Sequence, residues 1–289
     1  MTSARERPLR SLLFVPGDDG RRVSKALASA ADAVILDLED AVAANRKSEA
    51  RRSVAATVVH SDRAGLHVRV SAASTAGCLA DLEAVIAPNL AGVMLAKASS
   101  VQEVASVGWA IDQLEAQRGL TPGSIDLVPL IETAAGLVAL ENVCRAAGRI
   151  RCVAFGAADY TTDLGIDWTP DETELDAARR TLVTVSRATG LEPPLDAPVL
   201  EFRDSEKMRG SAARSRAYGF QGKLCIHPAQ IEACHQAFAP TQAELERAER
   251  ILAAFDTAAA RGIAAIEVDG ALVDYAVAVR ARRILASRP

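Results

Sequence analysis

Short apolar runs alternate with segments of helical periodicity along most of the chain. Eight runs are rich in branched residues, as buried parallel strands are, and lie at 11–17, 33–40, 67–72, 92–98, 126–133, 152–159, 194–200 and 222–227. Helical patterns follow them near 21–30, 46–59, 76–86, 101–118, 134–147, 171–189 and 205–218, and Pro228 opens another. Eight strand–helix units in about 235 residues predict a (β/α)₈ TIM barrel of the α/β class.

An open, doubly wound sheet is the alternative to the barrel. Such a sheet usually carries a glycine-rich nucleotide fingerprint after its first strand. The corresponding segment, Val-Pro-Gly-Asp-Asp-Gly at 15–20, lacks the G-x-G-x-x-G spacing. The pattern therefore favours the barrel.

A helical and hairpin extension follows the predicted barrel. The segment 241–261 is charged and helical, and Asp269-Gly270 between alternating apolar residues indicates a hairpin at 266–273. A helix over 275–287 closes the chain. We therefore expect a barrel over 1–239 and an extension over 240–289, which packs on this barrel or on that of a neighbouring subunit.

Composition narrows the class of protein. The 289 residues are 49% apolar, enough for a large core, and the net charge of −4 argues against nucleic-acid and anionic membrane partners. No run approaches the roughly 20 apolar residues of a membrane span, and the polar N-terminus lacks a signal core. The five cysteines form no C-x-x-C pair, which argues against structural zinc and disulfides. These features predict a soluble, cytoplasmic protein.

Carboxylates recur at the ends of the apolar runs. Asp37, Glu39 and Asp40 end the second run, Glu132 the fifth and Asp159 the sixth. In a barrel the carboxyl ends of the strands meet on one face, where the chemistry takes place. Several carboxylates there repel one another unless a cation joins them, and a hard divalent ion with oxygen ligands is the natural candidate. Solvated loop acids are the alternative.

Arg69 interrupts the apolar third run near its end. A guanidinium inside a barrel has to be paired or face an anion, because burying it alone is costly. It therefore either contacts a substrate anion or forms an ion pair with Asp37 or Glu39, and the two roles are compatible.

The motifs together identify a resemblance to the citrate lyase β-subunit-like branch of the HpcH/HpaI aldolase family. In order, they are LLFVPG at 12–17, LDLED at 36–40, VRV at 68–70, IET at 131–133, FG at 155–156, DY at 159–160, GFQGK at 219–223, IHP at 226–228 and VD at 273–274. The resemblance implies a Mg²⁺-dependent barrel that assembles as a homotrimer or hexamer. It also implies cleavage or formation of a C–C bond in malyl-, citramalyl- or citryl-type thioesters.

The resemblance assigns roles residue by residue. Glu132 and Asp159 match the Mg²⁺ ligands, and Arg69 would stabilise a thioester enolate or a substrate carboxylate. Glu39 and Asp40 would hold metal-bound water and orient Arg69. Asp274 would reach a neighbouring subunit's active site for proton transfer, or it caps a helix.

The family places CoA near basic residues that flank the first two strands, which here are Arg10, Arg21, Arg22, Lys25, Lys47 and Arg51. Each of them is equally well explained as a solvated surface charge. Lys97 and Lys223 match family lysines, and nothing requires a Schiff base at either. For His227 a structural hydrogen bond is favoured over a metal-ligand role.

Three positions depart from the family pattern. Ala158 stands where many members have Glu before the metal-binding Asp, Ser71 replaces Asn, and Ala96 replaces Pro. These changes leave the substrate open. We predict a metal-dependent carbon–carbon lyase that converts a 3-hydroxy-dicarboxyl-CoA thioester into a 2-oxo acid and an acyl-CoA. The alternatives are a CoA-independent aldolase of 2-oxo acids, an acyl-CoA thioesterase, and a lyase subunit that acts on a carrier-protein thioester.

Overall fold

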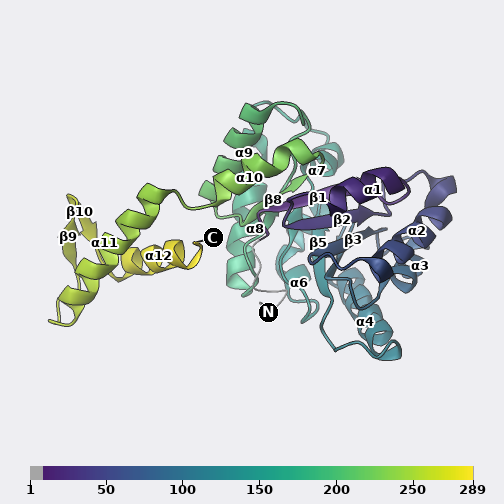
Figure 1. Cartoon of the computed structure of the whole chain (residues 1–289), viewed down its shortest axis with the longest axis horizontal. Helices are drawn as coiled ribbons and strands as arrows, with labels where there is room; N and C mark the ends of the chain where they lie inside the picture. The colour runs from purple at the N-terminus through teal and green to yellow at the C-terminus, as the bar shows by residue number, and fades with distance from the viewer. Residues whose placement is uncertain (1–8, 289) are drawn as a thin grey trace. The chain divides into compact units, whose positions relative to one another are not determined.

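A computed structural model describes residues 9–288 and contains a closed barrel of eight parallel strands in chain order (Figure 1). The strands are β1 (Ser11–Pro16), β2 (Ala33–Asp37), β3 (Leu66–Val70), β4 (Gly92–Leu95), β5 (Asp126–Ile131), β6 (Ala154–Phe155), β7 (Leu195–Asp196) and β8 (Gly222–Cys225). Pairing of β8 with β1 closes the barrel. The predicted (β/α)₈ fold is confirmed. The strands stop earlier than predicted, because the last residues of each run leave the ladder.

Helices surround the strands of the barrel. They are α1 (Gly20–Leu27), α2 (Lys47–His60), α3 (Gly77–Val85), α4 (Val101–Gln117), α5 (Ala134–Val138), α6 (Leu140–Cys144), α7 (Ala157–Leu164), α8 (Asp176–Ala188), α9 (Ser205–Tyr218) and α10 (Ile231–Phe238). Two helices differ from expectation. The helix predicted at 134–147 is divided at Ala139, and the end of the sixth apolar run begins α7 instead of extending the strand.

The barrel interior follows from the alternation of side chains along each strand. Inward positions form one apolar cluster, which includes Leu12, Ile35, Met94, Val128, Leu130, Ala154, Leu195 and Leu224. Strand β3 adds no apolar residue to this cluster, because its inward positions are His67, beside Ile35, and Arg69, beside Asp37. The same alternation carries β5 from Leu130 to Glu132. Polar side chains therefore lie directly above an apolar core, at the carboxyl ends of the strands.

Charged side chains are buried between β7, β8 and α8. The Lys223 ammonium donates to Asp196 Oδ2 at 2.8 Å, and Arg179 Nε donates to Asp196 Oδ1 at 3.1 Å. All three side chains are almost fully inaccessible. Removing one partner from such a cluster leaves an uncompensated buried charge and costs several kcal/mol (about 3–5). Lys223 is thus part of the packing of the barrel wall.

The His67 side chain is buried near the amino end of β3. Its Nδ1 lies 3.1 Å from the Gly65 carbonyl oxygen, so Nδ1 carries the proton and donates it. Burial lowers the pKa of His67 to about 4, below its ordinary 6.5. Because the folded state binds fewer protons than the unfolded one, stability should fall as the pH drops from about 6.5 toward 4. The loss expected from this shift is roughly 3 kcal/mol.

Replacing His67 with Asn should remove this pH dependence. Asn keeps a hydrogen-bond donor but does not titrate, so the variant should be less stable at pH 7.5 and lose less additional stability by pH 4.5. Urea unfolding at four pH values measures how the free energy of unfolding changes with pH in the wild type and in the variant. The exposed His60→Asn variant is the control. If His67→Asn lost as much stability between pH 7.5 and 4.5 as the wild type, titration of His67 would not be the cause of that loss.

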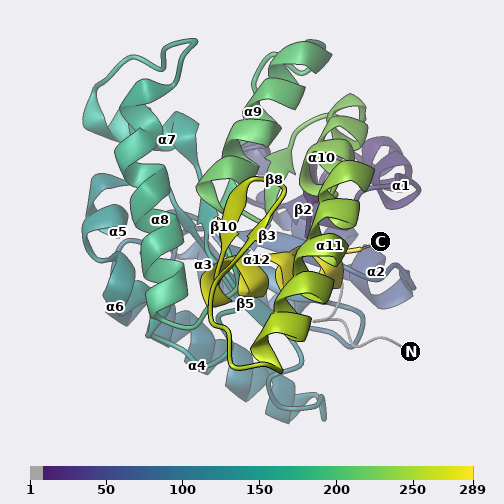
Figure 2. The same ribbon diagram turned by 90° about the vertical axis from the view of Figure 1, so that its left-hand side faces the viewer.

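The described chain divides into two compact units, the first ending at His235 and the second beginning at Gln236. The second contains α11 (Gln242–Ala259), the hairpin strands β9 (Ile266–Val268) and β10 (Ala271–Val273), and α12 (Tyr275–Ala286), as predicted from the sequence (Figure 2). Its own apolar cluster includes Ile251, Phe255, Val273, Ala278 and Ala281. Within residues 9–288, no helix has the length and apolar character needed to cross a bilayer.

Candidate active site

A cavity of about 350 Å³ opens at the carboxyl ends of the barrel strands. Its polar lining consists of Arg22, Asp37, Arg69, Glu132 and Asp159, and its apolar lining includes Phe14, Leu130, Ala157, Ala158, Pro198, Leu224 and Ile226. The cavity has the size of a small-ligand pocket. It brings together four carboxyl-end residues from β2, β3, β5 and the start of α7, as the sequence predicted for a barrel.

Arg69 forms a two-point ion pair with Asp37. Its Nε donates to Oδ1 at 2.8 Å and its Nη2 to Oδ2 at 2.5 Å, while Nη2 also lies 3.3 Å from Glu39 Oε2. The guanidinium stacks over the Phe14 ring, with 5.0 Å from Cζ to the centroid. Burial alone disfavours the charged form, but the hydrogen bonds that Arg69 donates to Asp37 raise the pKa of Arg69 above its ordinary value. Arg69 is therefore a fixed cation in the cavity wall.

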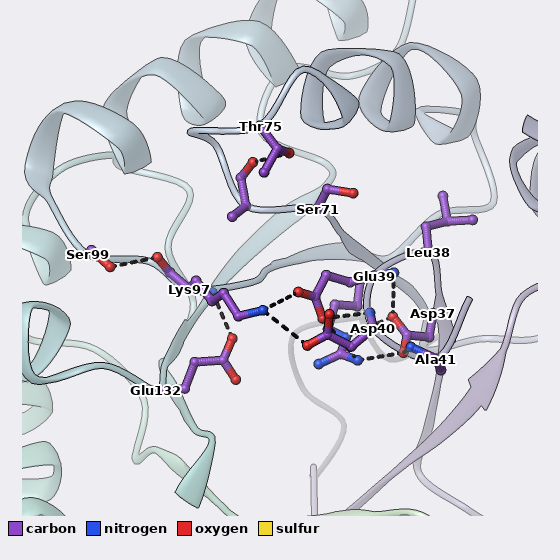
Figure 3. Close-up of polar contacts among 12 residues, drawn as sticks. Asp37, Leu38, Glu39, Asp40, Ala41, Ser71, Thr75, Lys97, Ser99 and Glu132 are labelled. Carbon is purple, nitrogen blue, oxygen red and sulfur yellow. Dashed lines mark hydrogen bonds and ion pairs between the residues drawn. The ribbon is translucent and has the colours of Figure 1, made fainter. Parts of the chain in front are cut away.

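Lys97 connects the loop after β2 to the end of β5 (Figure 3). Its ammonium donates to Glu39 Oε1 at 2.7 Å and to Asp40 Oδ2 at 3.0 Å, and its backbone N–H donates to Glu132 Oε1 at 2.8 Å. Burial opposes the charge on the ammonium, yet the two carboxylates raise the pKa of Lys97 above its ordinary value. The Lys97 ammonium is therefore a charged partner of these two carboxylates.

The backbone of Lys97 adopts φ = +51°, in the left-handed region that non-glycine residues rarely occupy. Such strain costs about 1–3 kcal/mol and persists where the surroundings hold it. Here the conformation aims the N–H at Glu132 while the side chain reaches the opposite acids. The strained backbone of Lys97 is therefore the part of the chain whose N–H orients Glu132.

Glu132 is 1% exposed and lies beside Gly156, where a Cβ atom would come within 2.4 Å of its Oε2. The absence of a side chain at Gly156 thus leaves the room that the Glu132 carboxylate occupies. Burial raises the pKa of Glu132 to about 8; the Lys97 N–H and Arg69 oppose this shift, and the Asp159 charge adds to it. A cation placed here displaces a proton from Glu132, so cation binding should strengthen as the pH rises toward 8.

The chemistry of these donors fits a hard divalent cation. Glu132 and Asp159 line the same cavity and interact electrostatically, and both offer oxygen. Among the described residues, no group of three or more His, Cys, Asp or Glu side chains is arranged around a metal position. A two-carboxylate site agrees with Mg²⁺, which keeps several waters and takes substrate oxygens as further ligands.

One expected detail of this pair is wrong. Asp159 does not end strand β6; it lies in the first turn of α7, after Gly156 caps that helix. The helix can begin early because Ala157, Ala158, Asp159 and Tyr160 carry no β-branch, whereas Val153, the β-branched residue of this run, precedes Phe155. Asp159 faces the cavity all the same.

Two of the six basic residues expected near CoA, Arg10 and Lys25, are placed away from the cavity. Arg10 precedes β1 at the amino end of the barrel, and its Nη2 and Nε form a paired contact with Asp32 at 2.8 and 2.9 Å. This expectation for Arg10 was wrong, because a residue before a barrel strand lies at the face opposite the site. Lys25 lies exposed in the last turn of α1, the end of the helix that returns toward that opposite face.

Lys47 and Arg51 lie on α2 and their cationic groups contact protein acceptors. The Lys47 ammonium donates to the backbone carbonyls of Leu38 and Glu39, each at 2.5 Å, and so holds the acidic loop. Arg51 Nε donates to the buried Asp81 at 2.5 Å. Asp81 in turn accepts from the Ser71 amide and hydroxyl. Both residues support loops beside the cavity, and a CoA contact by either stays a prediction.

Asp274 and His227 both act as helix caps. Asp274 Oδ1 accepts from the Val277 amide at 3.0 Å at the start of α12, within the second unit. Its expected role in proton transfer stays a prediction. His227 Nδ1 accepts from the Ala229 amide at 3.1 Å, and its ring stacks on Phe202. The expected structural role of His227 is confirmed.

Four residues of this site have contacts that the sequence did not specify. Asp37, one of the two acids expected as an ion-pair partner of Arg69, is its main partner. The Asp40 carboxylate orients Lys97 and not Arg69. The importance of Lys97 and Gly156 depends on backbone conformation and close approach. The match of Lys97 to a family lysine and the place of Gly156 in the FG motif indicated neither.

Replacing Arg69 with Lys should reduce activity about a hundredfold while preserving the charge. Lysine cannot reproduce the two-point contact with Asp37 or the stacking over Phe14. Steady-state kinetics should show the loss mainly in kcat, because the guanidinium stabilises charge that develops in the reaction. Arg145→Lys, an exposed helical pair with Glu141, is the matched control. Equal activity of the two variants would contradict this role for Arg69.

Comparisons with known proteins agree with this geometry. The HpcH/HpaI aldolase/citrate lyase family profile matches residues 10–228. The citrate lyase subunit beta of Escherichia coli strain K12 is 34% identical over 281 residues, which cover 96% of this chain and 93% of the relative. A (3S)-malyl-CoA thioesterase of Cereibacter sphaeroides is 35% identical over 281 residues, which cover 96% of this chain and 94% of the relative.

A solved structure extends the agreement. The protein CitE from Mycobacterium tuberculosis, in complex with magnesium, acetoacetate and coenzyme A, superposes with a TM-score of 0.81 at 33% identity and covers 97% of this chain and 98% of that one. The fold and the site thus define an enzyme of the aldolase and lyase class. The chain belongs to the HpcH/HpaI aldolase/citrate lyase family.

Proposed function

We propose that this protein is a Mg²⁺-dependent acyl-CoA lyase that cleaves or forms the C–C bond between a 2-oxo acid and the acyl group of a CoA thioester. The observation that carries the proposal is the placement of Glu132 and Asp159 in one cavity with the fixed cation Arg69. Relatives support it. Structures of the M. tuberculosis protein hold magnesium with pyruvate, and magnesium with oxaloacetate.

In this proposal Glu132 and Asp159 would hold the ion, which would act as a Lewis acid and offset the negative charge that develops on the substrate oxygens. Arg69 faces the thioester and stabilises negative charge on its oxygen. Lys97, Glu39 and Asp40 fix the loop after β2, so the cavity wall is in place before substrate binds. Such preorganised charge is usually the largest catalytic contribution.

Cleavage begins with removal of the β-hydroxyl proton by a base, for which we propose Asp274 of a second copy. The C–C bond then breaks, its electrons pass to the thioester as an enolate, and the hydroxyl carbon becomes the carbonyl of the 2-oxo acid. Protonation of the enolate gives the acyl-CoA. The role of Asp274 requires assembly into a trimer or hexamer in which one subunit's extension reaches another's cavity.

Thioester hydrolysis is the second candidate function, and the 35% identity to (3S)-malyl-CoA thioesterase favours it. Both reactions use the same cavity and differ in whether water reaches the thioester carbonyl. Thiol release monitored with a chromogenic disulfide, alongside 2-oxo acid formation, separates them. Free CoA without any 2-oxo acid identifies a thioesterase.

Isothermal titration of acetyl-CoA and propionyl-CoA in the presence of Mg²⁺ tests the proposal. Micromolar binding by the wild type, followed by product formation with a 2-oxo acid, is the expected result. Binding of pyruvate or glyoxylate but of no CoA thioester would instead indicate a CoA-independent aldolase. Binding of neither would point to a subunit that acts on a carrier-protein thioester, as the similarity to citrate lyase subunit beta permits.

A further inference from the structure

We propose that a cavity at the amino ends of the barrel strands is a binding site for a small uncharged molecule that donates a hydrogen bond, and that His67 is the acceptor. The cavity lies at the end of the strands opposite the candidate active site, so the inference is independent of the proposed lyase function. Three observations carry it: the place of the cavity, an unpartnered nitrogen of His67, and the pairing of the charges around it.

A cavity of about 200 Å³ opens among the segments that enter the strands. Its lining residues precede or begin six neighbouring strands, β1 to β6, and include Leu9, Asp32, Gly65, Ala91, Asp126 and Arg151. We call it the amino-end cavity. A cavity of roughly 150 Å³ takes up benzene, so this one has room for a molecule of about six non-hydrogen atoms. Catalysis at the opposite face of the barrel does not account for polar groups buried here.

His67 offers a hydrogen-bond acceptor to the amino-end cavity. Its side chain lines the cavity and is 1% exposed. Because Nδ1 donates to the Gly65 carbonyl, Nε2 carries the lone pair of the ring, and the lowered pKa of about 4 keeps that lone pair available at neutral pH. No described residue donates a hydrogen bond to Nε2. Native proteins rarely leave a buried acceptor unpaired, because its lost hydration is not replaced. A donor from outside the protein would complete the site.

The neighbouring strand leaves this nitrogen uncovered. Gly92 on β4 is the register partner of His67 on β3. A Cβ atom at Gly92 would lie 2.8 Å from Nε2 and 2.7 Å from the adjacent ring carbon, Cδ2. A side chain at position 92 would therefore displace the ring or cover Nε2. The pairing of His67 with a glycine keeps the acceptor clear of side-chain atoms on this side.

The three charged side chains that line the amino-end cavity already have partners of opposite charge. Arg10 donates to both oxygens of Asp32, at 2.8 and 2.9 Å. Arg151 lies 3.8 Å from the Asp126 carboxylate and donates to Glu192 at 2.9 Å. A charged ligand would have to compete with one of these pairs for a partner, and burying its charge without one is costly. An uncharged donor satisfies Nε2 and leaves the pairs intact.

Nuclear magnetic resonance of the full chain, labelled with nitrogen-15 at histidine, tests the inference. The chain has four histidines, and the His67 signals are those that His67→Asn removes. The probes are 2-propanol, which can donate a hydrogen bond, and acetone, which has nearly the same size and only accepts. We expect 2-propanol to shift the His67 Nε2 resonance saturably, with a dissociation constant in the millimolar range. Acetone should bind at least about tenfold more weakly, because it would place a second acceptor against Nε2.

The exposed His60 at the end of α2 is the internal control, since any general effect of the solvent acts on it as well. A His67 shift that grows linearly with 2-propanol and parallels that of His60 would be such a solvent effect and would overturn the inference. Equal affinity for acetone and 2-propanol would also overturn it, because the acceptor would then not select the ligand. If neither probe moves the Nε2 resonance, the amino-end cavity holds only water and the proposed site is wrong.

The same titration on Glu132→Gln separates this site from the candidate active site. We expect the dissociation constant of 2-propanol to stay within twofold of the wild-type value, because Glu132 lies at the carboxyl end of β5 and the amino-end cavity at the other end. Loss of the His67 shift in this variant would mean that the probe acts from the active-site cavity, and the inference would fail. Failure of the lyase assays, in contrast, leaves this titration unchanged.

Discussion

Replacing Glu132 with Gln is expected to lower lyase activity by roughly 10³-fold or more, because the variant loses one of two carboxylates available to the ion. Gln keeps the size of the side chain and can still accept the hydrogen bond from the Lys97 amide. The variant should therefore fold, and the burial that raises the pKa of Glu132 should no longer oppose folding at neutral pH. Mg²⁺ titration measures the loss of affinity for the ion, and steady-state kinetics measure the loss of activity.

The control for this variant is Glu141→Gln on α6, an exposed carboxylate 3.4 Å from Arg145. It removes the same charge from the surface and should leave activity within twofold of the wild type, since exposed pairs contribute little (about 0–1 kcal/mol). If Glu132→Gln retained normal Mg²⁺-dependent turnover, the ion would have to lie elsewhere in the barrel, and the proposed function would lose its main support.

Replacing Gly222 with Ala should cause the largest loss of stability. A Cβ atom at this position would lie 1.8 Å from the Leu9 carbonyl oxygen and 2.8 Å from Arg10 backbone atoms. Backbone has to move to relieve this overlap, at the seam where β8 pairs with β1 and the Lys223 amide donates to the Arg10 carbonyl. We expect a loss of about 3 kcal/mol or more, at the upper end for overpacked sites.

Urea or thermal unfolding measures this effect, with Gly210→Ala as the matched control. Gly210 lies within α9 and a Cβ atom there meets no atom within 4 Å, so alanine should stabilise the helix slightly, by up to about 1 kcal/mol. Wild-type stability of Gly222→Ala would mean that the closing strands are looser than the structure indicates.

The barrel was predictable from the sequence because its signal is repetitive. Each buried strand is a short run of branched apolar residues. The regular alternation of these runs with helical segments indicates a closed parallel sheet more strongly than any single element does. The ends of the elements were less predictable. The polar residues after Asp37 and after Ile131 continue the runs in sequence but leave the sheet, since ladder pairing ends there.

The acidic part of the site was predictable for the same reason: Glu132 and Arg69 continue the inward alternation of their strands. Contacts that depend on three-dimensional proximity were not. Arg10 and Lys25 are basic and close to the first strand in sequence, but the direction of the chain places them toward the opposite face of the barrel. The reach of Lys97 to Glu39 spans 58 positions in the chain, which no local pattern reveals.

Lys97 contacts Glu132 through its backbone and Glu39 and Asp40 through its side chain, and the two contacts can change separately in evolution. Its amide bond to Glu132 belongs to the main chain and persists whatever residue occupies position 97, whereas its tie to Glu39 and Asp40 depends on the ammonium. A lineage that replaces this lysine by glycine keeps the left-handed backbone at lower cost and keeps Glu132 in place. The acidic loop loses the contacts of this ammonium and keeps those of Lys47 with the Leu38 and Glu39 carbonyls. The geometry of the proposed metal ligand and the mobility of the loop above it can therefore evolve separately.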